Sequence, residues 1–277
     1  MPELPETETI ARDLHLMLAG VRVESATVLR ADVLRSVSAA EFEHRLQGAT
    51  ITRAWRRAKL IILDLDSGDA IVVQPRFTGA MLVESTPADI SDRDRLYITL
   101  TVTLDDGRLL HYRDIRRLGT VALLGRCQLA GALAPLGPEP LDPDLTAERF
   151  SVSLRNSRQA IKKVLMDQQV LAGVGNIYAN EALWMARIDP SRPAGSLSDT
   201  EAGTLLRAVR EVLTASIAVR GTSFRDYVDA KGGRGGFVPF LQAYGRGGLA
   251  CARCATPLVD TSAIDGRTTV FCWRCQA

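Results

Sequence analysis

The sequence predicts an α+β protein, with a β-rich N-terminal part, a helical second part and a short cysteine-rich end. Three observations support this prediction. Short alternating or apolar runs, separated by turn signals, fill the first 130 residues, which is typical of a sandwich or barrel. From residue 146 onward the apolar residues recur with helical spacing. Four cysteines form two close pairs within the last 27 residues.

The N-terminal domain is expected to span residues 1–130 and to begin with a helix at 7–18. Turn signals such as Ser67-Gly68-Asp69 separate the strands that follow. The expected strands are 21–28, 49–55, 60–65, 70–73, 81–84, 96–104, 109–112 and 120–124. So many short strands must share one core, because a single short strand buries too little apolar surface to be stable alone.

A linker is predicted at residues 131–146, which hold four prolines and two glycines. Helices are then expected at 147–153, 158–166, 177–186 and 199–219. Ser198 or Asp199 is the predicted N-cap of the longest helix, because a short side-chain oxygen there can accept a free backbone N–H.

Cys251, Cys254, Cys272 and Cys275 have the spacing C-x2-C-x17-C-x2-C. Two such pairs, brought together by a hairpin, suit one tetrahedral zinc ion. Two disulfides are the alternative, but the chain begins without an export signal, which favours a reducing compartment and the metal. Four sulfur ligands leave no open position, so the zinc is expected to be structural. The remaining cysteine, Cys127, is expected to be a small buried apolar residue.

The composition is that of an ordinary globular protein of 30.1 kDa, with 46% hydrophobic and 24% charged residues. No apolar run is long enough to span a membrane, and we expect a cytoplasmic protein. The net charge of +2 argues against nucleic-acid binding by the chain as a whole. However, residues 151–187 hold five basic and two acidic side chains, and residues 205–250 hold seven and three. We therefore expect one basic cleft between the two domains, with acidic flanks elsewhere.

Four motifs occur in a fixed order. They are Pro2-Glu3-Leu4-Pro5-Glu6, Arg56-Arg57-Ala58-Lys59, Ala172-Gly173-Val174-Gly175-Asn176-Ile177-Tyr178-Ala179-Asn180-Glu181, and the cysteine hairpin. Together they resemble the Fpg/Nei family of DNA glycosylases with lyase activity, over positions 2 to 275. The resemblance implies a β-sandwich with an N-terminal helix, a helix–two-turn–helix domain with a base-binding loop at 147–244, and a zinc-finger β-hairpin at 245–277. It also implies a monomer that acts on double-stranded DNA.

The resemblance places the catalytic residues at Pro2, Glu3 and Lys59. Once Met1 is removed, Pro2 carries a secondary amine. A terminal amine has a pKa of about 8, low enough for part of it to be an unprotonated nucleophile at neutral pH. Glu3 would shuttle protons beside it. Lys59, at the start of an apolar strand, would contact the phosphates of the damaged nucleotide. Glu6 is either a second orienting carboxylate or a favourable acidic residue at the start of a helix.

The resemblance assigns four further residues to DNA binding. Lys162, Asn176 and Arg267 are expected to bind its phosphates, and the fourth is Tyr244. Asn176 follows a tight glycine turn at the start of a helix, where free N–H groups favour a phosphate. Arg267 lies five residues before Cys272, where the family has its finger arginine. Each of these residues on its own would be an ordinary helix start or an exposed basic side chain.

Three further residues correspond to the side chains that this family inserts in place of the flipped base. Arg116 matches the family pattern. Phe77 stands where a methionine is usual, and Leu118 stands where a phenylalanine is usual. The apolar wedge is therefore kept with the aromatic ring moved to the other loop, and insertion repays part of the unstacking cost. The alternative is that Phe77 and Leu118 are both core residues.

The predicted function is excision of oxidised purines, 8-oxoguanine and formamidopyrimidines, through a Schiff base on Pro2 followed by β,δ-elimination. The segment 136–141 and the length of the loop at 225–240 resemble the purine-specific branch, although Gly-Gly-Arg-Gly-Gly at 232–236 is unusual there. Alternatives are a glycosylase for oxidised pyrimidines and a DNA-binding relative with weak or no catalysis. A zinc-ribbon RNA-binding protein fits less well, because the N-terminal motif has no place in it.

Overall fold

The computed structural model describes residues 2–277, and the predicted removal of Met1 falls outside the described residues. The chain forms two compact units. The first comprises Met1–Pro135 and Val219–Gly236, and the second comprises Leu136–Ala218 and Phe237–Ala277. The segment 219–236 thus groups with the N-terminal unit, whereas the predicted boundaries placed it in the helical domain. Tyr227 and Ala230 explain the difference, because both are buried in the core of the first unit.

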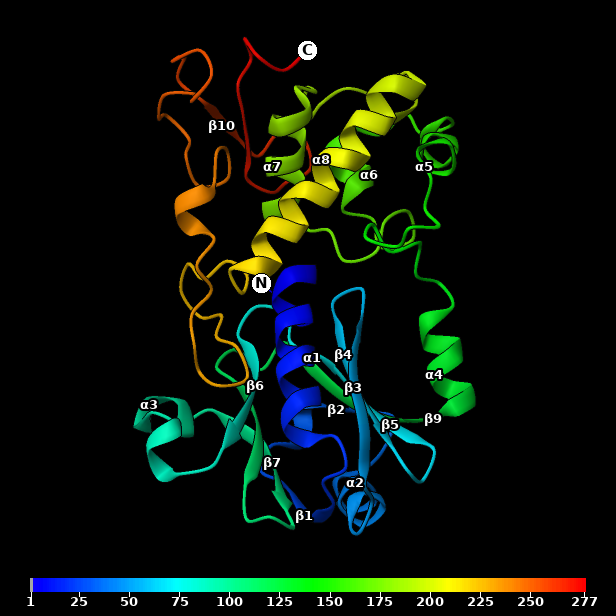
Figure 1. Ribbon diagram of the computed structural model, residues 1–277, viewed down its shortest axis with the longest axis vertical. Coiled ribbons are helices and arrows are strands. Elements are labelled where there is room, and N and C mark those ends of the chain that lie inside the picture. Colours follow the sequence, from blue (N-terminus) through cyan, green and yellow to red (C-terminus); the bar gives the residue numbers. More distant parts are fainter. Residues whose placement is uncertain (1) are drawn as a thin grey trace. The chain divides into compact units, whose positions relative to one another are not determined.

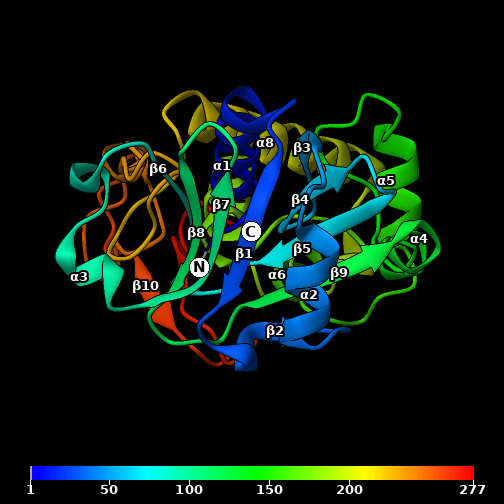
Figure 2. The ribbon, with the colours of Figure 1, turned by 90° about the horizontal axis from the view of Figure 1, so that it is seen from below.

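Two sheets form the first unit, which confirms the predicted sandwich with its N-terminal helix (Figure 2). The four-stranded sheet has the order β1(Val23–Val28), β7(Ile98–Leu104), β8(Leu109–Asp114) and β6(Gly79–Glu84). The five-stranded sheet has the order β2(Leu34–Arg35), β9(Thr120–Gly125), β5(Asp69–Gln74), β4(Leu60–Leu65) and β3(Ile51–Arg57). Neighbouring strands are antiparallel except for β2 and β9, which are parallel.

Strand β4 shows why the sequence of a strand in the five-stranded sheet can be a continuous apolar run. Ile61 and Leu63 point into the core shared by the two sheets, whereas Ile62 points to the opposite face. That outer face is covered by α4(Arg126–Leu133), which packs Leu129 and Leu133 onto it (Figure 1). A strand buried on both faces loses the polar alternation of a half-exposed strand. Cys127 was expected to be buried, and this was wrong, because it lies on α4 and is exposed.

Helix α1(Leu4–Leu18) lies alongside the two sheets and packs against β3 and β4 (Figure 1). It buries Ile10, Leu14 and Leu18 in the shared core. It begins three residues before the predicted start, because Pro5 fits the first turn and the Glu6 carboxylate accepts the backbone N–H of Glu3 at 2.8 Å. The short helix α2(Ala39–Leu46) was not predicted; it is capped by Ser38 and buries two apolar residues. The remaining short elements of this unit are η1(Ala31–Val33), η2(Pro87–Asp89) and α3(Asp92–Arg95).

The second unit is helical, with a cysteine-bearing hairpin at its C-terminal end. Its elements are α5(Ala147–Leu154), α6(Ile161–Leu165), α7(Asn176–Ala186), η3(Ala194–Ser196), α8(Asp199–Ala218), η4(Val238–Phe240), β10(Val259–Thr261) and β11(Thr269–Phe271). Helix α8 packs against α5 and α7. Its N-cap is Ser198, which accepts the N–H of Glu201 at 3.2 Å and donates its own N–H to the Glu201 carboxylate at 2.8 Å. Arg210 on α8 donates to the carbonyls of Pro140, Asp142 and Leu145, so that this part of the predicted linker is fixed to the unit. Among residues 2–277, no helix is both long and apolar enough to cross a membrane.

Candidate functional site

The N-terminal end of α1 brings two buried carboxylates together. Glu3 is 2% exposed and Glu6 is 1% exposed, and Pro2 is also buried. One oxygen of Glu6 accepts the N–H of Glu3, and the other accepts the N–H of Thr222 at 2.7 Å. Gly221 has a positive φ of 87°, and a Cβ at this position would lie 2.9 Å from the Glu6 carboxylate. Glu6 therefore joins the start of the chain to the start of the loop 219–236, and the glycine allows that close approach.

Arg220 anchors the same loop to α1 by two ion pairs. Its Nη2 lies 2.5 Å from a carboxylate oxygen of Asp13 on α1 and 2.5 Å from one of Asp229 within the loop. Asp229 is almost fully buried and also accepts the N–H groups of Lys231 and Gly233 at 2.9 and 2.8 Å. The glycine-rich end of the loop is thereby wrapped around Asp229. A glycine-rich segment has a high ordering cost, and these contacts offset part of it before any ligand binds.

Lys59 lies in the two-residue turn between β3 and β4. The preceding residue, Ala58, has a positive φ of 51°, and its carbonyl accepts a hydrogen bond from Arg56 at 3.0 Å. The same guanidinium donates from Nε to Glu8 on α1 at 2.8 Å. Glu8 also accepts from Arg12 at 2.7 Å. The turn that presents Lys59 is therefore tied to the helix that carries Glu3.

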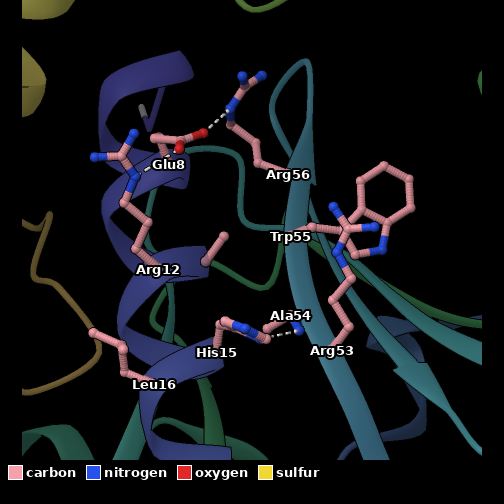
Figure 3. A pocket seen from close by; sticks show the side chains of 9 residues that line it. Glu8, Arg12, His15, Leu16, Arg53, Ala54, Trp55 and Arg56 are labelled. Atoms are coloured by element: carbon pink, nitrogen blue, oxygen red, sulfur yellow. Dashed lines mark hydrogen bonds and ion pairs between the residues drawn. The ribbon is translucent and has the colours of Figure 1, made fainter. Parts of the chain in front are cut away.

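An open groove of about 560 Å³ lies below this connection, between α1 and β3 (Figure 3). Glu8 and His15 of α1 face Arg56 and Ala54 of β3, whereas Arg12 extends along the side of the helix away from the strand to reach Glu8. The side chains of Arg53 and Trp55 lie on the other side of the strand. Burial alone would raise the pKa of Glu8. The hydrogen bonds and charges of Arg56 and Arg12 outweigh burial and hold that pKa below its usual value, so Glu8 stays a carboxylate at neutral pH.

The three predicted wedge residues lie on two loops of the first unit. Phe77 follows β5 and is 47% exposed, and Leu118 precedes β9 and is 43% exposed. The Arg116 guanidinium lies 5.2 Å from the centre of the Phe77 ring, within cation–π range. The alternative that Phe77 and Leu118 are both core residues is wrong. The structure presents an exposed apolar pair with an arginine beside it.

Asp114, which the sequence did not single out, holds the two wedge loops together. It is 1% exposed and accepts hydrogen bonds from the Thr78 hydroxyl at 2.5 Å and from the Gly119 N–H at 2.7 Å. The N–H of Arg116 donates to the Thr78 hydroxyl at 3.0 Å. A Cβ at Gly119 would overlap the Tyr112 hydroxyl, so only glycine allows this approach. One buried carboxylate thus bonds a side chain of the Phe77 loop and the backbone of the Leu118 loop.

In the second unit, the predicted backbone-binding residues Lys162, Asn176 and Arg267 converge on the turn 265–269. Lys162 is fully buried and donates to Asp265, to the Thr268 carbonyl and to the Thr269 hydroxyl. Asn176, the first residue of α7, donates to the same Thr268 carbonyl at 3.0 Å. The Arg267 side chain is exposed. Tyr244, the other predicted residue of this group, lies between η4 and the first cysteine pair.

Glu181 positions the segment before and around Tyr244, and sequence analysis did not assign it this role. Its carboxylate accepts three backbone N–H groups, from Gln242, Ala243 and Tyr244, at 2.7 to 2.9 Å. Burial raises the pKa of Glu181, and these three hydrogen bonds oppose that increase. The sequence offers one signal for this role, a charged residue within a largely apolar helical segment. In the structure, the residues of α7 from Ile177 to Trp184 are all buried, including Glu181. A buried carboxylate of this kind needs partners.

The four cysteines form one cluster whose sulfur atoms all lie within 4.8 Å of one another. Cys251 and Cys272 are almost fully buried, and β10 and β11 form the hairpin between the two pairs. The sulfurs are close enough to share a single tetrahedral ion, for which metal–sulfur distances are about 2.3 Å. The apolar cluster around them is small, with Trp184, Ala243, Leu258 and Val270 as its other buried members. The four sulfurs can hold one metal ion, and such an ion would stabilise a hairpin that has only a small apolar core.

Comparison with known proteins agrees with this arrangement. Residues 1–121 match the family model described as formamidopyrimidine-DNA glycosylase N-terminal domain, and residues 136–228 match its H2TH domain. Formamidopyrimidine-DNA glycosylases of Heliobacterium modesticaldum and Xanthomonas campestris are 39% and 40% identical to this chain, over the full length of both sequences in each case. The chain therefore belongs to the formamidopyrimidine-DNA glycosylase family.

Solved structures show the same similarity. MutM (Fpg) from Thermus thermophilus superposes with a TM-score of 0.86 at 35% identity, covering 99% of this chain and 98% of that one. The Lactococcus lactis Fpg in complex with abasic-site DNA gives a TM-score of 0.90 at 29% identity, covering 99% of each chain. A Lactococcus lactis Fpg mutant bound to DNA containing Fapy-dG gives the same TM-score at 31% identity, again covering 99% of each chain.

Proposed function

We propose that this protein is a bifunctional DNA glycosylase and abasic-site lyase that removes oxidised purines from duplex DNA as a monomer. The observation that supports it most directly is the N-terminal group, in which Pro2 is followed by two buried carboxylates, Glu3 and Glu6. Relatives of this chain have been solved with DNA containing Fapy-dG and with abasic-site DNA. Membership of their family makes such lesions the first candidates here.

The proposed reaction begins at the amine of Pro2, after Met1 has been removed. The amine attacks C1′ of the damaged nucleotide, the base leaves with a proton, and opening of the sugar gives an iminium Schiff base. Glu3 is proposed to protonate the sugar oxygen as the ring opens. Loss of a proton from C2′ then expels the 3′ phosphate, and a second elimination expels the 5′ phosphate. The positioning role for Glu6 is favoured, because its carboxylate links Glu3 to the loop 219–236.

Substrate positioning is assigned to two groups of residues in the first unit. Lys59 is proposed to bind the phosphates of the flipped nucleotide as a point charge. Phe77 and Leu118 are proposed to fill the space that the base leaves, with Arg116 facing the orphaned partner base. In support, Phe77 and Leu118 are exposed, and the Thr78 hydroxyl of one loop and the Gly119 N–H of the other both donate to Asp114. The loop 219–236 is proposed to cover the base, which favours the purine branch over the pyrimidine branch.

The second unit is proposed to hold the DNA backbone. Arg267, on the exposed finger turn, and Asn176, at the start of α7, would bind phosphate oxygens, and Tyr244 would do so from the segment held by Glu181. The four cysteines are proposed to hold one zinc ion, which supplies only structural stability, because four sulfurs complete its coordination. The chain's own residues carry every chemical step.

Borohydride trapping on duplex DNA tests the proposal. Protein without Met1 is expected to give a covalent adduct with an abasic-site duplex and with an 8-oxoguanine duplex, and a weaker one with an oxidised-pyrimidine duplex. Pro2→Gly should abolish the adducts, whereas Arg12→Gln, on an exposed face of α1, should retain them. A DNA gel shift with no adduct would instead identify a binding protein without catalysis. A preference for the oxidised-pyrimidine duplex would assign this protein to the pyrimidine-specific branch of the family.

A further inference from the structure

The N–H donors of the Lys162 ammonium group are hydrogen-bonded to acceptors within the protein. A lysine has three N–H donors and no acceptor. The Lys162 nitrogen lies 3.2 Å from both carboxylate oxygens of Asp265, 3.2 Å from the Thr268 carbonyl and 2.8 Å from the Thr269 hydroxyl. These acceptors are all on the single turn 265–269. The side chain of Lys162 is 0% exposed and that of Asp265 is 3% exposed.

The same turn presents Arg267, whose side chain is exposed. The backbone N–H of Arg267 donates to Oδ1 of Asp265 at 3.0 Å, the oxygen that also accepts from Lys162. Asn176 donates at 3.0 Å to the Thr268 carbonyl, which also accepts from Lys162. Lys162 on α6 and Asn176 on α7 thus both hold the Thr268 carbonyl, which follows Arg267, and Lys162 also holds the Asp265 carboxylate that accepts the Arg267 N–H.

We propose that Lys162 is a positioning residue that holds the Arg267 turn and is not itself a ligand of the DNA phosphates. This inference rests on the proposed DNA-binding function of the second unit, and it changes the role that family resemblance gave to Lys162. To reach a phosphate, the ammonium would have to leave a buried carboxylate, which would then remain uncompensated in the protein. Arg267 can reach a phosphate without breaking any of these contacts.

The proposal has a consequence for the salt dependence of binding. Each basic residue that neutralises a DNA phosphate releases counterions, and contributes about 0.9 to the slope of log affinity against log salt concentration. A lysine already neutralised by a buried aspartate releases none. Removing both charges of the Lys162–Asp265 pair should therefore leave the slope unchanged, whereas removing Arg267 should lower it.

The double variant Lys162→Met/Asp265→Asn tests this directly. Methionine occupies the volume of the lysine stem, and asparagine keeps Oδ1 as the acceptor for Arg267. On a duplex with a non-cleavable abasic analogue, Lys162→Met alone should weaken binding, because it leaves the Asp265 carboxylate unpaired. The double variant should return to within about twofold of the parent, with the parental slope. A double variant that stays as weak as the single one, with a slope smaller by about 0.9, would show that Lys162 binds a phosphate.

A labelling experiment on the unmodified protein keeps the proposal testable if the variants fold poorly. Lys163 is the matched control, since it is adjacent in sequence and exposed. Reductive methylation of the free protein should modify Lys163 and leave Lys162 unreacted. Reaction of Lys162 at the rate of Lys163, with protection by DNA, would overturn the proposal. Labelling of the free protein does not depend on glycosylase activity, so this test can fail independently of the proposed function.

Discussion

Glu8 and Arg56 connect the first helix to the turn that carries Lys59. The Glu8 carboxylate accepts from Nε of Arg56 at 2.8 Å, and another nitrogen of the same guanidinium donates to the carbonyl of Ala58 at 3.0 Å. The side chain of Arg56 is 8% exposed. Pro2 and Glu3 stand at one end of this connection and Lys59 at the other, so we expect it to set their relative placement.

Replacement of Glu8 by glutamine should slow catalysis more than it weakens binding. The amide loses the charge that holds Arg56, so the Ala58–Lys59 turn loosens, and small displacements of catalytic groups are costly. We expect the single-turnover rate on an abasic-site duplex to fall roughly tenfold, with little change in KM. Arg12→Gln is the control, because Arg12 binds the same carboxylate but its side chain is 63% exposed and makes no described contact with the turn. Equal rates for the two variants would contradict this role of Glu8.

Replacement of Asp114 by alanine should affect both wedge loops at once. The change leaves the Thr78 hydroxyl and the Gly119 N–H without a buried acceptor, so the first unit should lose about 3 kcal/mol of unfolding free energy. The rate of base excision from duplex DNA should fall at least as much as it does in the variants Phe77→Ala and Leu118→Ala. The measurement is urea unfolding together with single-turnover excision. If Asp114→Ala were as stable and as active as the parent, the buried carboxylate would not be what holds the loops.

Acid should weaken the second unit partly through Glu201. The hydrogen bond from Arg192, and then that from the Ser198 backbone, lower the pKa of Glu201 to about 2 from 4.5. Because the folded pKa lies below the unfolded value, the stabilisation is present above pH 4.5 and is lost as the pH falls towards 2. The side chain is 37% exposed, so solvent screening limits the effect to about 1 kcal/mol. Between pH 5 and pH 2.5, Glu201→Gln should lose that much less unfolding free energy than the parent, and equal losses would refute the assignment.

Removal of the metal should unfold the cysteine hairpin. The surrounding apolar cluster is small, so we expect the ion to supply much of the local stability. A strong chelator under reducing conditions should release one equivalent of zinc, change the fluorescence of Trp184 and abolish DNA binding. Cys272→Ser should bind no zinc and show the same loss. Retained DNA binding with no zinc released would contradict a structural metal.

The strands were predictable because their patterns are local. Each of the eight expected strands of the first unit corresponds to an observed strand with ends shifted by at most two residues, since alternation and turn residues mark them directly. Helix α4 was missed because few apolar residues anchor it and Gly131 interrupts its pattern. The fold class and the cysteine cluster were likewise evident from the spacing of residues.

The residues that hold the site together were much less predictable. Asp114 bonds to Thr78, 36 positions earlier, and Glu181 bonds to Tyr244, 63 positions later. No local spacing records such contacts. Lys162 shows another limit, because family resemblance singled it out as DNA-binding, but only the structure shows that its ammonium bonds to the turn 265–269 of the same protein.

The identity of the residue that carries the trapped DNA is the most direct test of the proposed chemistry. After borohydride reduction on an abasic-site duplex, the adduct can be digested and its peptides sequenced by mass spectrometry. The account predicts that the DNA remnant is on Pro2, at the terminus of a chain lacking Met1. An adduct on Lys59 or another lysine, or no adduct with protein that lacks Met1, would contradict it.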